Sequence, residues 1–139
     1  MPRDLIVGYD DSDGARAALV AAIDLAVALG DRLVIAFGYE PPGDIGEELT
    51  AARAAVREIG ERVAHHALSR ATAAGVDAEL AVVDARPVEA LLEIAAERDA
   101  RMIVVGSYGD SPLKGAILGS VPHKLLHLAD RPVLAVPAA

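Results

Sequence analysis

The chain has 139 residues, 53% of them apolar and 24% charged, and it contains no cysteine. This length is typical of a single domain, so we expect residues 1–139 to form one domain whose core needs neither disulfides nor a structural metal. The lack of cysteine excludes a disulfide framework, a thiolate zinc site and a cysteine nucleophile. The apolar runs are shorter than the roughly 20 residues of a membrane helix, and the first is too short for a signal peptide. We therefore expect a soluble, cytoplasmic protein without a membrane partner.

The formal net charge is −8, and the excess of acidic residues lies entirely in residues 1–85. No basic stripe is present, so we expect no nucleic-acid partner. The only two lysines, Lys114 and Lys124, lie in the C-terminal part. An anionic ligand is therefore expected near these lysines.

Apolar periodicity predicts strands that alternate with helices along the whole chain. The strand at 76–83 alternates apolar and polar residues and resembles a half-exposed edge strand. In chain order, the predicted elements are a strand at 5–7, a helix at 15–29, a strand at 33–37, a long amphipathic helix at 47–74, the strand at 76–83, a helix at 87–98, a strand at 102–105, a helix that follows a glycine-rich stretch and runs to 128, and a strand at 133–136.

Local signals mark several of the helix ends. Ser12 or Asp13 can cap the first helix, and Gly30 can end it. Pro87 and Pro122 suit the first turns of the third and fourth helices. Because most strands are apolar throughout, they are expected to be buried on both faces. The sequence thus predicts an α/β fold, an open five-stranded parallel sheet of order 3-2-1-4-5 with helices on both faces.

In such a sheet, ligands bind at the carboxyl ends of the strands where the winding direction reverses, here between strands 1 and 4. The loops at 8–14 and 106–120 meet there, and they are the two most unusual loops of the sequence. The second contains four glycines before a helix start at Gly119-Ser120, a composition that suits phosphate binding by backbone N–H groups. The alternative is that these glycines simply make two tight turns.

The first loop is acidic and would repel phosphates. Asp10, at the end of strand 1, can accept hydrogen bonds from ribose hydroxyls or an adenine amino group, or it can be merely solvated. Helix capping and solvation account for Asp11 and Asp13. The aromatic residues fall at strand ends and either wall a base pocket or pack in the core: Tyr9, Phe37, Tyr39 and Tyr108.

The histidines do not indicate catalysis. His123 and His127 have the spacing of two metal ligands on one helix face, but no third ligand is evident, so a surface pair is preferred. His65 and His66 lie on the long helix. Neither candidate ligand loop contains a histidine that could act as a base.

The spacing Gly106-x2-Gly109-x9-Gly119-Ser120, together with the opening at 5–12 and the ending at 118–136, resembles the universal stress protein family over nearly the whole chain. This resemblance implies a Rossmann-like fold similar to adenine-nucleotide alpha hydrolases. It also implies ATP as ligand, with Mg²⁺ as a possible companion, in a stress-response protein with little or no turnover and no catalytic residues. The residues implied as binding the nucleotide are Asp10, Gly38, Gly106, Gly109, Lys114, Gly119, Ser120 and Val121.

The resemblance also implies a homodimer formed through the last strand, Val133, Leu134, Ala135 and Val136. This chain departs from the family pattern at Asp11, where glycine is usual, at Tyr108, where Arg or His is common, and at 85–87, where Gly-Asp-Pro is typical. Two other classes are kept as alternatives. One is an enzyme that uses adenine nucleotides, a slow ATPase or an adenylyl-transfer domain. The other is a phosphoacceptor receiver module with acids at Asp10, Asp11 and Asp84.

Overall fold

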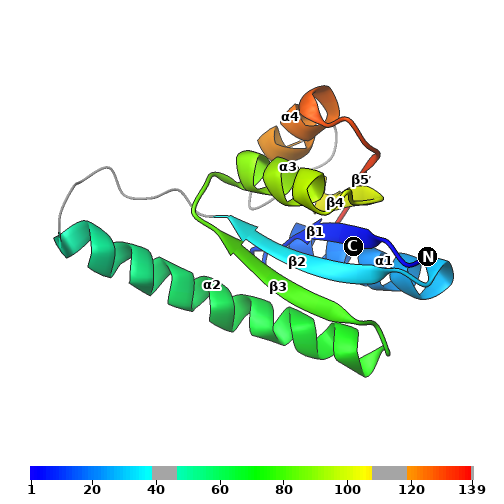
Figure 1. The fold of residues 1–139 in the computed structure, drawn as a ribbon, viewed down its shortest axis with the longest axis horizontal. Coiled ribbons are helices and arrows are strands. Elements are labelled where there is room, and N and C mark those ends of the chain that lie inside the picture. The colour runs from blue at the N-terminus through cyan, green and yellow to red at the C-terminus, as the bar shows by residue number, and fades with distance from the viewer. Residues whose placement is uncertain (39–46, 108–118, 139) are drawn as a thin grey trace.

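A computed structural model describes residues 1–38, 47–107 and 119–138 (Figure 1). Strands and helices alternate as predicted, with ends that differ from the expected ones by a few residues. The elements are β1 (Asp4–Gly8), α1 (Asp13–Leu29), β2 (Arg32–Gly38), α2 (Glu47–Ala73), β3 (Ala78–Val83), α3 (Pro87–Glu97), β4 (Met102–Gly106), α4 (Ser120–Leu128) and β5 (Val133–Val136).

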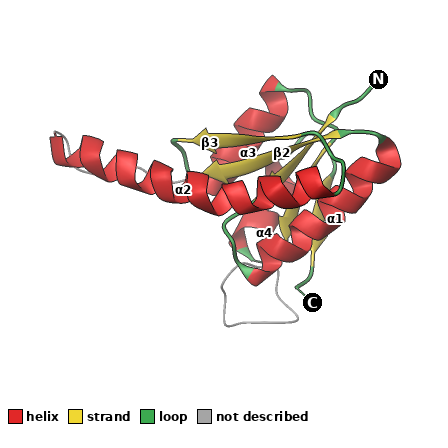
Figure 2. Cartoon of the chain, turned by 90° about the horizontal axis from the view of Figure 1, so that it is seen from below, coloured by secondary structure: helices red, strands yellow, loops and turns green. Residues whose placement is uncertain are grey.

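The strands form one parallel sheet in the order β3-β2-β1-β4-β5, which confirms the predicted fold class. The helices cover both faces, α1 and α2 on one and α3 and α4 on the other (Figures 1 and 2). Alternate residues of each strand point to opposite faces, so each strand contributes to two cores.

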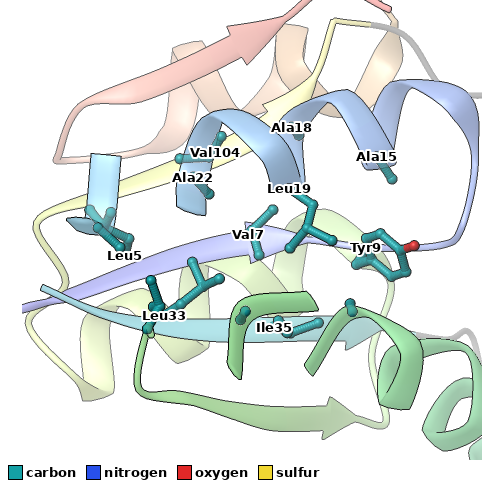
Figure 3. Close-up of a cluster of buried hydrophobic side chains, with 14 of the residues drawn as sticks. Leu5, Val7, Tyr9, Ala15, Ala18, Leu19, Ala22, Leu33, Ile35 and Val104 are labelled. Atoms are coloured by element: carbon teal, nitrogen blue, oxygen red, sulfur yellow. The ribbon is translucent and has the colours of Figure 1, made fainter. Parts of the chain in front are cut away.

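The first core lies between the sheet and α1 and α2. Leu5, Val7 and Ile35 pack there against small residues such as Ala18 and Ala22 (Figure 3). The alanines let the helix backbone approach the sheet closely. The second core lies under α3 and α4, where Ile6, Val34, Ile103, Leu91 and Leu125 are buried.

β3 is an edge strand, as predicted. Asp77 just before it and Glu79 within it are exposed, as the alternating pattern predicts, and the other residues of the strand are half-buried. Leu80 packs against the first core, whereas Ala81 and Val83 pack against the second.

All strands are parallel, so their carboxyl ends share one edge of the sheet. Gly38 pairs with Val83, and Gly106 pairs with Val136 at this edge. The ends of β1 and β4 thereby lie side by side, because these two strands are neighbours in the sheet. Within the part of the chain described here, no helix combines the length and apolarity needed to span a membrane.

Candidate functional site

The loop between β1 and α1 presents Asp10 to solvent. Oδ1 of Asp10 accepts a hydrogen bond from the backbone N–H of Ser12 at 3.0 Å. The Ser12 hydroxyl accepts one from the Ala15 N–H at 3.2 Å and caps α1, which confirms the predicted cap. Since the Asp10 side chain is exposed, its other oxygen can accept a hydrogen bond from a ligand.

Asp11 has a structural role that the sequence did not reveal. Its φ is 63°, in the left-handed region, and Oδ1 accepts hydrogen bonds from the Tyr9 hydroxyl and from Arg16 Nε, both at 3.0 Å. The hydrogen bond from Arg16, followed by that from Tyr9, lowers the pKa of Asp11. Burial, followed by the bond to Asp11, raises the pKa of Tyr9. The explanation of Asp11 by capping and solvation is therefore wrong, because its charge is paired with Arg16.

Asp13 is the first residue of α1, and its carboxylate also lies 3.3 Å from Arg16 Nη1. Arg16 itself was missed by the sequence analysis. The available signal was its place one turn into a helix that follows three acidic residues.

Two of the four aromatic residues lie in the described part of the chain, and Tyr9 is buried whereas Phe37 is half-buried. Tyr9 is 3% exposed and belongs to the first core. Phe37 lies against Gly60 of α2, where a Cβ atom would be 2.4 Å from Phe37 Cδ1. Packing thus accounts for both residues, while Tyr39 and Tyr108 lie outside the described residues.

The start of α4 lies directly against the end of β4. The Gly119 N–H donates a hydrogen bond to the Ser107 carbonyl at 2.7 Å, and the Ser107 N–H donates one to Val136 at 2.8 Å. Ser120 is exposed and opens the helix, and Val121 packs at the edge of the second core. Gly109 and Lys114 of the predicted set lie outside the described residues.

The N-terminus of α4 has the properties of an anion site. Its cap, Gly119, offers no side-chain hydrogen bond, and its first turn contains no acidic residue. The first N–H groups of a helix have no partners within the helix and carry partial positive charge. This helix start can therefore accept a phosphate or another anion.

Close packing explains two of the predicted site glycines. A Cβ atom on Gly106 would lie 2.7 Å from the carbonyl carbon of Gly14, at the start of α1. On Gly38 it would lie 2.8 Å from Ala90 Cβ and 3.0 Å from the Ala85 carbonyl oxygen. Gly106 is the last residue of β4, so among the glycines of the 106–120 stretch this one is explained by close packing rather than by a tight turn. Both positions therefore need glycine so that the elements can pack closely at the carboxyl edge.

The paired histidines of α4 contact each other. The rings of His123 and His127 meet edge to face, with centroids 4.8 Å apart. Among residues 1–38, 47–107 and 119–138, no group of three or more His, Asp or Glu side chains could hold a metal ion.

The winding direction reverses between β1 and β4, where the acidic β1–α1 loop lies near the uncapped start of α4, so the fold is that of an α/β protein with a candidate ligand site at the carboxyl edge of its sheet. Residues 1–137 match the model of the universal stress protein family, and the chain belongs to that family. This membership decides against the receiver-module alternative.

Individual relatives match along nearly their whole length. The chain is 33% identical over 147 residues to the universal stress protein YxiE of Bacillus subtilis, covering 95% of this chain and 97% of the relative. A universal stress protein solved in complex with cAMP is 32% identical, with a TM-score of 0.79 over 99% of this chain and 98% of that one. The hypothetical protein MJ0577 is 20% identical and shares the fold, with a TM-score of 0.90 over 100% of this chain and 98% of that chain.

Proposed function

We propose that this protein binds an adenine nucleotide, ATP in particular, between the β1–α1 loop and the start of α4, and regulates a stress response with little or no turnover. The observation that carries the proposal is the Gly119–Ser107 hydrogen bond, which sets an uncapped helix start at the end of β4, next to β1. The cAMP complex of a relative at 32% identity supports an adenine ligand.

The two sides of the proposed site differ in charge and therefore suit different parts of the nucleotide. The exposed Asp10 suits the neutral hydroxyl and amino donors of the nucleoside, and the backbone at Gly38 lies on the same edge. The first N–H groups of α4, at Ser120 and Val121, suit the phosphates, and Gly106 and Gly119 have no side chain to keep the phosphates away from the backbone. Gly109 and the cation of Lys114 belong to the same proposal. Any Mg²⁺ would be held largely by the phosphates, as is usual for this ion in nucleotide sites.

Titration calorimetry with ATP and adenosine tests this assignment. Gly119 has φ −63° and ψ 165°, a conformation that valine also adopts, so the Gly119→Val variant should fold. Its side chain should abolish ATP binding, because it would keep the phosphates away from the backbone at the start of α4. Lys114→Ala should weaken the binding of ATP more than that of adenosine. Lys124→Ala removes the chain's other lysine and serves as the control. Intact ATP binding in Gly119→Val, or an equal loss of ATP and adenosine in Lys114→Ala, would overturn the assignment.

Low turnover is expected because neither candidate ligand loop contains a histidine or glutamate that could activate water, and the charge of Asp11 is already paired with Arg16. We expect steady-state phosphate release below about one per second, the low end of ordinary enzymes. Faster release would instead favour the alternative of an enzyme that uses adenine nucleotides.

A further inference from the structure

The β1–α1 loop contains a strained residue at its centre. Asp11 has a backbone φ of 63°, a conformation that residues other than glycine adopt only infrequently. Such a conformation persists only where surrounding contacts hold it. Here two contacts do so, since the Tyr9 hydroxyl and Arg16 Nε both donate to Oδ1 of Asp11 at 3.0 Å.

The two anchors differ in mobility. Tyr9 is 3% exposed and lies in the first core with Ala15 and Leu19, so its hydroxyl is a fixed point (Figure 3). Arg16 is half-exposed and reaches back from α1, where it also pairs with Asp13 at 3.3 Å. Asp11 is therefore held between the rigid sheet and the first turn of α1.

The conformation of Asp11 determines where its neighbours lie. Asp10 immediately precedes it and accepts a hydrogen bond from the N–H of Ser12, which immediately follows it. A change in the backbone at Asp11 would break that bond and rotate the Asp10 carboxylate. It would also disturb the Ser12 cap of α1.

We infer that Tyr9 and Arg16 are positioning residues of the nucleotide site, which hold Asp11 in the left-handed conformation and so aim Asp10 at the nucleoside. This inference rests on the proposed function. Arg16 acts on the ligand through the loop and makes no contact with phosphate. Pairing with Arg16 also compensates the charge of Asp11 beside an anionic ligand.

A double-mutant cycle between Asp11 and Arg16 tests the inference, with ATP and adenosine titrated separately by calorimetry. Arg16→Met should weaken both ligands by about three- to tenfold, the effect of one lost hydrogen bond. Asp11→Gly should bind within about twofold of the unmodified chain, because glycine adopts this φ without anchors. The double variant Asp11→Gly/Arg16→Met should match Asp11→Gly, so that glycine rescues the loss.

Arg57→Met is the matched control, since Arg57 pairs with Glu61 on the surface of α2 at 3.5 Å and should leave binding unchanged. If Arg16→Met weakens ATP binding but leaves adenosine binding unchanged, Arg16 contacts the phosphates directly and the inference is overturned. The inference is also overturned if the double variant binds as weakly as Arg16→Met. Unchanged binding in Arg16→Met would also overturn it.

If Arg16→Met fails to unfold cooperatively, Tyr9→Phe, which removes only the buried hydroxyl, must show the same loss and the same rescue by glycine. If the unmodified chain binds neither ligand, the proposed function fails, and the inference fails with it.

Discussion

Gly106 lies where the end of β4 closely approaches the start of α1. A Cβ atom there would meet three backbone atoms of Gly14 at 2.7–2.9 Å, and backbone cannot move aside as a flexible side chain can. We predict that Gly106→Ala lowers the free energy of unfolding by about 2–3 kcal/mol, in the range of overpacked cores. Urea unfolding measures this.

Gly8→Ala is the matched comparison, because its Cβ would meet only side-chain atoms, Leu91 Cδ1 and Val105 Cγ1, at 3.3 Å. A smaller loss is expected, since both side chains can shift by a few tenths of an ångström. Equal stability of Gly106→Ala and the unmodified chain would contradict the packing explanation.

Asp10 carries the nucleoside half of the proposed site. We predict that Asp10→Ala weakens adenosine and ATP by a similar factor, about tenfold for a charge-assisted hydrogen bond, because the contact does not involve phosphate. Calorimetry on both ligands checks this. Asp10→Asn is the control that keeps an oxygen to accept from the Ser12 N–H, so it separates loss of the carboxylate from loss of the loop turn. A loss confined to ATP would place the phosphates, rather than the nucleoside, beside Asp10.

At the scale of elements, an ion pair between the buried Asp31 and the partly exposed Arg101 joins the amino ends of the strands. The Asp31 side chain is fully buried just before β2, and it accepts hydrogen bonds from Arg101 Nε, next to β4, and from the Arg3 N–H, next to β1, at 2.9 Å. The hydrogen bond from Arg101, above all, lowers the pKa of Asp31. The pair thus links three strands at the edge opposite to the candidate site.

We predict that Asp31→Asn lowers the free energy of unfolding by about 1–3 kcal/mol, the range for losing a hydrogen bond to a charged group. Because the pKa of Asp31 is lower in the folded state, its contribution is complete above the unfolded value of about 3.9 and is lost as the pH falls through the folded pKa. The stability of the unmodified chain should therefore fall more steeply in acid than that of Asp31→Asn. Urea titrations at several pH values measure both curves.

Asp130→Asn serves as the control for this pair. Asp130 bonds to Arg131 at 3.0 Å, but its side chain is 82% exposed, and exposed pairs contribute little. We expect no measurable change in stability or in its pH dependence. An acid response of Asp31→Asn identical to that of the unmodified chain would show that another carboxylate dominates.

The helices, the strands and their order could be predicted from the sequence because they depend on local patterns. Continuous apolar strands, three- and four-residue spacing in helices, Ser12 as a cap and Gly30 as a stop all act within a few residues. The pairing of Asp31 with Arg101 spans 70 positions and could not be read from either residue alone. The same holds for Gly106 against Gly14, a contact whose distance is fixed only by how α1 packs on β4.

The candidate site was partly predictable for the same reason. Asp10 and Gly119 follow from the rule that loops gather at the carboxyl edge of a parallel sheet. The anchoring of Asp11 by Tyr9 and Arg16 depends on the backbone turn of the loop, and the acidic composition alone favoured solvation instead.

At the scale of the whole molecule, the two edges of the sheet differ. The long helix α2 runs beside β3 at one edge, whereas β5 forms the other (Figure 1). Among the described residues, no strand pairs with the outer side of β5, and Leu134 on it is 37% exposed. An unpaired, apolar edge strand presents N–H and C=O groups to another chain.

We therefore predict a two-fold homodimer in which the β5 strands of two copies pair antiparallel, as a two-fold axis at a sheet edge requires. Sedimentation at micromolar concentration should give the mass of two chains. Leu134→Lys should yield a monomer, because each dimer would bring two lysines together across the axis. Ile59→Lys places the same charge at a residue that is 50% exposed on α2, beside the opposite edge, and it should leave the dimer intact. A monomeric unmodified chain, or an unchanged mass in Leu134→Lys, would exclude pairing through β5.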